Sequence, residues 1–153
     1  MKKRIWALFS VLLVIALLAA CTKDVDIDLT ALRKELQSAG IFEDELVSLS
    51  QDIIPIEAEI DSDLFISAEY WKGSGVTGEE IGLFRCGSNK DAKELEKQLI
   101  EHRDSLYDTY ASYKQEALPR IGNAVIRCKG SYVVFVSAED YQQAARIVDQ
   151  YFK

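Results

Sequence analysis

The chain has 153 residues, enough for one ordinary domain, and it carries 18 Lys and Arg against 25 Asp and Glu, a formal charge of −7. A surface this acidic is repelled by phosphate groups, so we expect no nucleic-acid partner. The sequence contains no dinucleotide fingerprint and no His, Cys and carboxylate cluster at metal-ligand spacing, so we also expect no cofactor and no bound metal.

The first 20 residues have the pattern of a targeting segment. Basic residues at 2–4 precede the apolar run IWALFSVLLVIALLAA, which ends on two alanines directly before Cys21. Leu18, Ala19, Ala20 and Cys21 resemble the lipobox of bacterial lipoproteins. That resemblance implies cleavage before Cys21, a diacylglyceryl group on its thiol, at least two acyl chains such as palmitate, and a location on the outer face of the cytoplasmic membrane. Removal of the segment lowers the formal charge to −10.

The competing interpretation is an uncleaved transmembrane helix. The uncharged run over residues 5–22 is at the short end of the roughly 20 residues that span a bilayer, so its length leaves this alternative open. A transmembrane helix does not explain the small pair before the cysteine, and we therefore favour the lipid anchor. Two acyl chains hold a protein on a membrane stably, whereas one chain binds marginally.

Residues 21–28 are polar and acidic, and we predict that they form a tether ahead of a single α+β domain over 29–153. Alternating aspartates there have the spacing of a calcium loop, but Leu29 stands where that loop requires glycine. A solvated tether is therefore the preferred interpretation.

The domain begins with a predicted helix from Thr30 that ends at Gly40. The segment 41–60 gives no clear pattern, and Pro55 interrupts any long element there. Strands are then predicted over 64–71 and 79–86, since β-branched and aromatic residues flank the glycine-rich connection KGSGVTG and favour a hairpin.

A long helix is predicted over 91–117, with Pro119 beyond its end. At about 100° per residue its apolar residues form one stripe that faces a core. Strands over 123–128 and 131–138 then form a second hairpin, whose second strand is apolar on both faces and should be central. A final helix covers 139–152. The order helix, hairpin, helix, hairpin, helix predicts a two-layer α+β sandwich, with a four-stranded, mostly antiparallel sheet and three helices on one face.

Four segments resemble the DUF4358 family of bacterial lipoproteins. They are GSGVTGEEIGLFRC at 73–86, the helix that carries Arg103, LPRIGNAVIRCKGSYVVFVS at 118–137 and the closing AEDYQQAARIVDQYF. The matching motifs are structural in character, namely turns and strand starts. The family has no established catalytic residues, and the resemblance implies an envelope role beside membrane-bound acyltransferases and partner proteins of surface-glycan modification in Gram-positive bacteria.

Few residues suggest chemistry. The sole histidine, His102, lies at the edge of the long helix's apolar stripe, where it is either a general base or a partly buried residue with one hydrogen bond; we favour the second. Arg103 beside it could clamp an anion, or its stem could pack on the sheet while its head pairs with a carboxylate. A groove that exposes Trp71 or the tyrosines of the long helix (Tyr107, Tyr110 and Tyr113) would favour a binding module.

The two remaining cysteines, Cys86 and Cys128, each close a predicted strand. Outside the membrane a disulfide between them is permitted. If the central strand lies between their strands, however, the Cα atoms would be about 10 Å apart, too far to bridge. Buried free thiols are the preferred alternative.

The sequence thus favours a lipid-anchored envelope protein whose small domain binds or scaffolds a ligand or partner that the residues do not identify. One alternative is an accessory subunit of an envelope enzyme complex, such as one for surface-glycan acylation. The other is a hydrolase that uses His102. The partners we expect are the membrane, through the lipid on Cys21, and an envelope protein.

Overall fold

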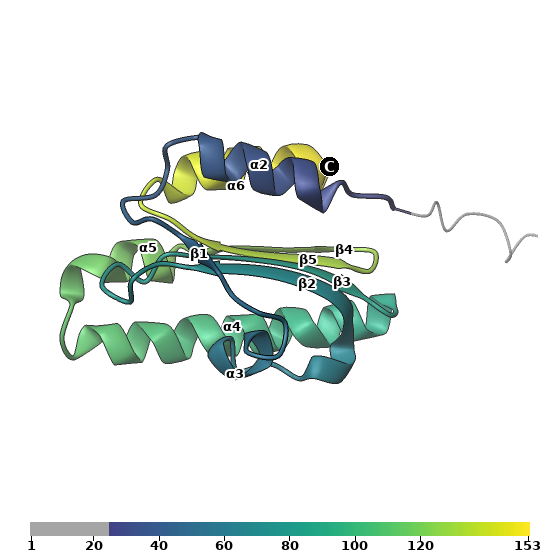
Figure 1. The fold of residues 1–153 in the computed structure, drawn as a ribbon, viewed down its shortest axis with the longest axis horizontal. Helices are drawn as coiled ribbons and strands as arrows, with labels where there is room; N and C mark the ends of the chain where they lie inside the picture. Colours follow the sequence, from purple (N-terminus) through teal and green to yellow (C-terminus); the bar gives the residue numbers. More distant parts are fainter. Residues whose placement is uncertain (1–24) are drawn as a thin grey trace, which may run out of the picture.

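The computed structural model describes residues 25–153, and in that part of the chain one antiparallel sheet lies between two layers of helices (Figure 1). The α+β class and the two predicted hairpins are confirmed. The elements in chain order are α2 (Leu29–Ser38), β1 (Val47–Ser48), α3 (Ile54–Glu57), β2 (Phe65–Lys72), β3 (Glu80–Cys86), α4 (Asn89–Ala111), α5 (Leu118–Gly122), β4 (Val125–Lys129), β5 (Tyr132–Ser137) and α6 (Tyr141–Tyr151), with short 3-10 turns at Ser62–Leu64 and Gln115–Ala117.

The sheet has five strands in the order β1-β2-β3-β5-β4, and each neighbouring pair is antiparallel. Every residue of β5 is buried, as expected for a strand with apolar residues on both faces. The predicted count of four strands is wrong because β1 was missed. This strand consists of Val47 and Ser48 alone, which is too short for any periodicity to reveal.

Helices cover both faces of the sheet, so the predicted two layers and three helices are also wrong (Figure 1). On one face α2 and α6 pack over a core that includes Ile81 and Leu83 of β3. On the other face α4 and α3 pack over a core that includes Phe84 and Phe135. Because successive residues of a strand point to opposite faces, interior strands that are apolar throughout need cover on both sides.

Local signals account for the helix boundaries. Asp28 caps α2, since its carboxylate accepts a hydrogen bond from the N–H of Ala31 at 2.8 Å. Ser88 caps α4 in the same way. The predicted long helix over 91–117 ends earlier in the structure, at Ala111. Pro119 lies in the first turn of the separate helix α5, where the missing N–H of proline costs nothing.

Within the predicted tether over 21–28, residues 25–28 contact the domain. Val25 packs against the turn at Gly130, Ile27 is buried, and Tyr132 donates a hydrogen bond from its hydroxyl to Asp26 at 3.3 Å. The predicted acylation site Cys21 and the predicted targeting segment lie outside the described residues. Within 25–153, no helix has the combination of length and apolar character needed to cross a membrane.

Two ends of the domain are named here by the residues that they contain. The Val25 end contains Val25 and the β4–β5 turn around Gly130. The Glu79 end contains Glu79, the loop 73–78, the loop 40–46 and α5. Helix α4 runs from one end to the other (Figure 1).

Candidate functional site

Two adjacent glutamates are each only 1% exposed: Glu79 directly precedes β3, and Glu80 is its first residue. Neighbouring side chains of a strand point to opposite faces of the sheet, so the two carboxylates occupy separate environments. A buried carboxylate without partners would cost several kcal/mol. Each glutamate is therefore surrounded by its own set of donors.

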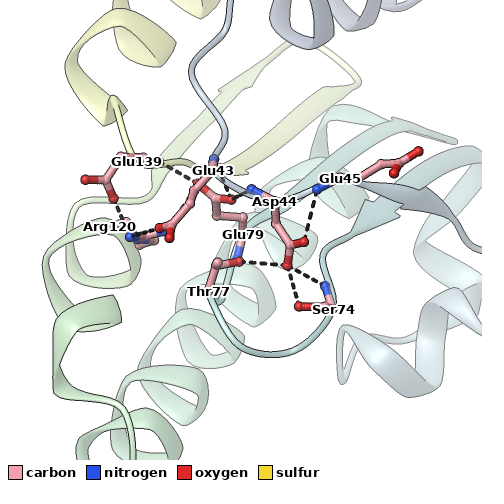
Figure 2. Close-up of polar contacts among 8 residues, drawn as sticks. All are labelled: Glu43, Asp44, Glu45, Ser74, Thr77, Glu79, Arg120 and Glu139. Atoms are coloured by element: carbon pink, nitrogen blue, oxygen red, sulfur yellow. Dashed lines mark hydrogen bonds and ion pairs between the residues drawn. The ribbon is translucent and has the colours of Figure 1, made fainter.

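The carboxylate of Glu79 joins segments that are distant in the sequence (Figure 2). It accepts hydrogen bonds from the backbone N–H groups of Glu43 at 3.0 and 3.1 Å, of Asp44 at 2.8 Å and of Glu139 at 2.9 Å. It thus holds the loop after α2 and the loop before α6 against the start of β3.

Arg120 on α5 supplies the positive charge beside Glu79 (Figure 2). Its Nη1 lies 3.3 Å from Oε1 of Glu79, and its Nη2 contacts the carboxylates of Glu43, at 2.8 Å, and of Glu139. The arginine side chain is 8% exposed, whereas those of Glu43 and Glu139 are each 62% exposed. One buried guanidinium is thereby matched against one buried and two exposed carboxylates.

Asp44 fixes the adjoining loop 73–78 (Figure 2). Its Oδ2 accepts hydrogen bonds from the N–H and the hydroxyl of Ser74, both at 2.6 Å, and from the hydroxyl of Thr77 at 3.3 Å. The bonds from Ser74 lower the pKa of Asp44 below its usual range. A Cβ on Gly73 would lie 2.7 Å from the same Oδ2, so a side chain at residue 73 would force this carboxylate to shift.

The other side of this loop rests on the end of α4. Tyr110 donates a hydrogen bond from its hydroxyl to the carbonyl of Gly75 at 2.8 Å, and its ring packs against that of Tyr113 with centroids 5.1 Å apart. Tyr113, Tyr107 and Val76 are exposed beside it. Of the three predicted groove tyrosines, Tyr110 is therefore a buried support for the loop and the other two face outward.

On the opposite face of the sheet, Glu80 forms a compact network with Tyr70 and His102. The hydroxyl of Tyr70 donates to Oε2 of Glu80 at 2.5 Å, and Nε2 of His102 lies 2.9 Å from the same oxygen. Burial, followed by the charge of Glu80, raises the pKa of Tyr70 well above its ordinary value. The phenol is thus held as a hydrogen-bond donor.

His102 therefore has the carboxylate partner that a general base would need, but it is sealed from solvent. Its side chain is 2% exposed and meets the ring of Phe135 edge-on. The hydroxyl within hydrogen-bond distance is that of Tyr70, at 3.3 Å. This geometry matches the preferred interpretation of a buried histidine held by a hydrogen bond better than it matches a general base that must reach a substrate.

Lys72 connects this network to the surface. Its Nζ lies 2.9 Å from Glu57 and 3.3 Å from Oε1 of Glu80, with a quarter of the side chain exposed. Burial lowers the pKa of Lys72, but the charges of Glu80 and Glu57 outweigh that effect, and the net shift is upward. The ammonium group therefore stays charged and compensates the buried carboxylate.

The three predicted ligand contacts are not brought together. Arg103 pairs on the surface with its neighbour Asp104 at 2.7 Å. Trp71 packs on the α2–α6 side of the sheet, where the guanidinium of Arg33 lies 5.0 Å from its ring centroid. His102 lies on the opposite side, so these residues do not form a common site.

Cys86 and Cys128 are both free thiols. Their strands β3 and β4 are separated by β5, which is the arrangement that places the Cα atoms too far apart to bridge. Burial, aided by the nearby Cys128, raises the pKa of Cys86 to about 12, and burial also raises that of Cys128.

Two open clefts lie away from His102. The first, of about 500 Å³, is at the Val25 end, between the start of α2 and the sheet. The second, of about 250 Å³, lies beside Asp44 in the loop after α2. Across residues 25–153, no group of three or more His, Cys, Asp or Glu side chains is arranged to hold a metal ion.

Sequence reasoning missed Glu79, Glu80 and Arg120. The available signal was the pair EE at the start of the apolar run IGLF, because glutamate is almost never fully buried without a partner. Their partners could not be named from the sequence, since the backbone groups that Glu79 binds lie up to 60 residues away.

The family model described as "Domain of unknown function (DUF4358)" matches residues 46–138. That range contains the whole sheet and α4, together with Glu79, Glu80 and Arg120, while α2 and α6 lie outside it. Comparisons with curated proteins and with solved structures gave no match.

Proposed function

The chain belongs to the DUF4358 family, and from that premise and the geometry of the domain we propose that it is a lipid-anchored cell-envelope protein whose Glu79 end binds or scaffolds a partner. The family description assigns no activity. The proposal therefore depends on where the domain begins and on how its opposite end is built.

The position of Val25 carries the proposal. The described domain starts there, and the roughly four residues from Cys21 span at most about 14 Å when extended. Helix α4, with 23 residues, is about 35 Å long and runs towards the Glu79 end (Figure 1). A lipid on Cys21 would hold the Val25 end near the membrane and direct the Glu79 end away from it.

The Glu79 end is rigid enough to act as a recognition surface. The carboxylate of Glu79 holds two loops, Asp44 holds a third, and Arg120 joins α5 to them. Loops fixed in this way lose little conformational entropy on binding, which favours affinity.

The composition of this end favours a protein partner, which supports the accessory-subunit alternative. Val76 is 51% exposed and Tyr113 is 59% exposed, and both lie at the same end of the sheet as the exposed carboxylates of Glu43 and Glu139. Protein interfaces combine aromatic and apolar groups with a polar rim in this manner. We therefore propose that the partner is a protein of an envelope enzyme complex, such as one for surface-glycan acylation.

Lipid labelling of the full chain tests the anchor. The Cys21→Ser variant should lose the label and leave the membrane fraction or remain unprocessed. The control is Cys128→Ser, which also removes one thiol and should keep both label and location. Unchanged labelling of Cys21→Ser would refute the anchor.

Pull-down from detergent-solubilised membranes tests the recognition surface. Val76→Asp, at the Glu79 end, should reduce recovery of a stoichiometric partner about tenfold or more, as expected for a residue near an interface centre. The matched control is Ile66→Asp, which is similarly exposed but lies near the Val25 end. An equal loss in both variants, or no stoichiometric partner for the wild type, would contradict the proposal.

A further inference from the structure

The cleft at the Val25 end is lined by one exposed arginine and several acidic residues. Its volume is about 500 Å³, and its walls include Asp26 and Asp28 ahead of α2 and Glu69 of β2. Arg85 lies on its floor. This arginine is the one exposed residue of β3, whose other six residues are buried.

The sheet itself explains why the cleft is open. Arg85 pairs in register with Ser67 on one side and Tyr132 on the other, so this row of the sheet is polar across three strands. Two residues along β3, Leu83 pairs with Val134 in the core beneath α2 and α6. The helical layer thus covers the apolar rows and leaves the polar row accessible.

Arg85 has no partner among the described side chains, since no carboxylate within 25–153 lies in ion-pair distance of its guanidinium. The acidic groups of the cleft are each engaged through one oxygen only. Asp26 accepts from Tyr132, Asp28 accepts from the N–H of Ala31, and Oε2 of Glu69 lies 3.1 Å from Nε of Arg33. The cleft therefore offers one uncommitted cation together with carboxylate oxygens that can still accept.

A ligand that satisfies both features carries a positive and a negative charge. A purely anionic ligand would meet Arg85 but would be repelled by the carboxylates of Asp26 and Asp28, and a purely cationic ligand would leave the guanidinium unpaired. The fork of donors on arginine matches the oxygens of a phosphate group. Tyr132, which pairs in register with Arg85, donates a hydrogen bond from its hydroxyl to Asp26, so the carboxylate side of the cleft lies on the β5 side of Arg85, where a short ammonium arm beside that phosphate would point.

We propose that this cleft binds the zwitterionic phosphodiester headgroup of a membrane lipid, of the phosphoethanolamine type, with the phosphate on Arg85 and the ammonium group towards Asp26 and Asp28. The inference rests on the proposed anchor, because a lipid on Cys21 would bring this end of the domain to the headgroup layer. It extends that proposal by assigning a chemical class to a second membrane contact.

Titration calorimetry on the full chain in detergent tests the assignment with a soluble probe, sn-glycero-3-phosphoethanolamine. The wild type should bind it, and Arg85→Gln should weaken binding about tenfold or more through loss of a charge-assisted pair. Arg103→Gln is the control, because it removes the same charge from a surface pair on α4. Asp26→Asn should weaken binding of this probe but not of glycerophosphoglycerol, which lacks the ammonium group.

Three results would overturn the assignment: no heat of binding at millimolar probe, equal binding by the wild type and Arg85→Gln, or tighter binding of glycylglycine, whose anion is a carboxylate. Because the probe is soluble, the titration does not depend on acylation of Cys21. Probe binding by a chain that takes no lipid label would refute the membrane as the source of the headgroup, while the charge chemistry of the cleft would stand.

Discussion

Replacing Glu79 with glutamine is the sharpest test of the network at the Glu79 end. The change preserves shape and removes one charge. Both carboxylate oxygens are engaged: Oε1 accepts from the N–H groups of Glu43 and Glu139, and Oε2 accepts from those of Glu43 and Asp44. The amide nitrogen of glutamine, in either orientation, would face backbone donors.

The magnitude follows from these contacts. A buried donor left without an acceptor costs about 1–3 kcal/mol, and at least one N–H group is orphaned in Glu79→Gln. The variant also removes the buried counter-charge of Arg120, which keeps only the exposed carboxylates of Glu43 and Glu139. Breaking a buried pair typically costs about 3–5 kcal/mol, so we expect about 3 kcal/mol here. That is a large share of the roughly 5–15 kcal/mol by which domains are stable.

Urea unfolding of the full chain in detergent, followed by circular dichroism, measures how far Glu79→Gln lowers the free energy of unfolding. The matched control is Glu139→Gln, which removes the same charge from the same arginine at a 62% exposed position and should cost less than about 1 kcal/mol. If the two variants unfold with free energies within about 0.5 kcal/mol of each other, the inferred role of Glu79 is refuted.

Three further predictions concern the loop, the buried phenol and the thiols. Because hydrogen bonds from Ser74 lower the pKa of Asp44, its carboxylate stabilises the fold above the unfolded pKa of about 3.9 and loses this effect as the pH falls through the folded value. The difference in stability between the wild type and Asp44→Ala should therefore be larger at about pH 7 than in acid, and it should shrink as the pH falls below about 3.9; a difference that does not change with pH would contradict this. Tyr70→Phe removes the donor to Glu80 and should lower the free energy of unfolding by about 1–3 kcal/mol. An unchanged midpoint of urea unfolding would contradict this prediction. Cys86, with its pKa raised to about 12, should resist iodoacetamide at about pH 8 until urea unfolds the chain, and peptide mass spectrometry that finds it modified in the native state would speak against its burial.

Patterns that depend on neighbouring residues were readable from the sequence. Gly40, with φ of 66°, follows the end of α2, and Gly130, with φ of 59°, forms the β4–β5 turn, both where residue type alone suggested a break. The apolar run of β5 likewise indicated an interior strand. Such features need only local geometry and hydrophobic periodicity, which the sequence displays directly.

Features that depend on distant contacts were not readable. The two-residue strand β1 exists because Val47 and Ser48 pair with Lys72 and Trp71 of β2. Its own two residues form no pattern that predicts a strand. The burial of Glu79 depends in the same way on backbone donors from two remote loops. The run IGLF could have indicated helices on both faces, since its alternate residues are equally apolar.

The adjacent glutamates also fix the register of the central strand. A slip of β3 by one residue in one direction would place Glu80 among the backbone donors and Arg120, and Ile81 beside Tyr70 and His102. A slip in the other direction would place Glu79 beside Tyr70 and His102, and Gly78 among the backbone donors. Apolar strands tolerate such slips because most of their residues are interchangeable. Glu79 and Glu80 oppose a slip, since in either direction one of the two sites would lose its carboxylate, and the chain thereby specifies one alignment at the point where the strand begins.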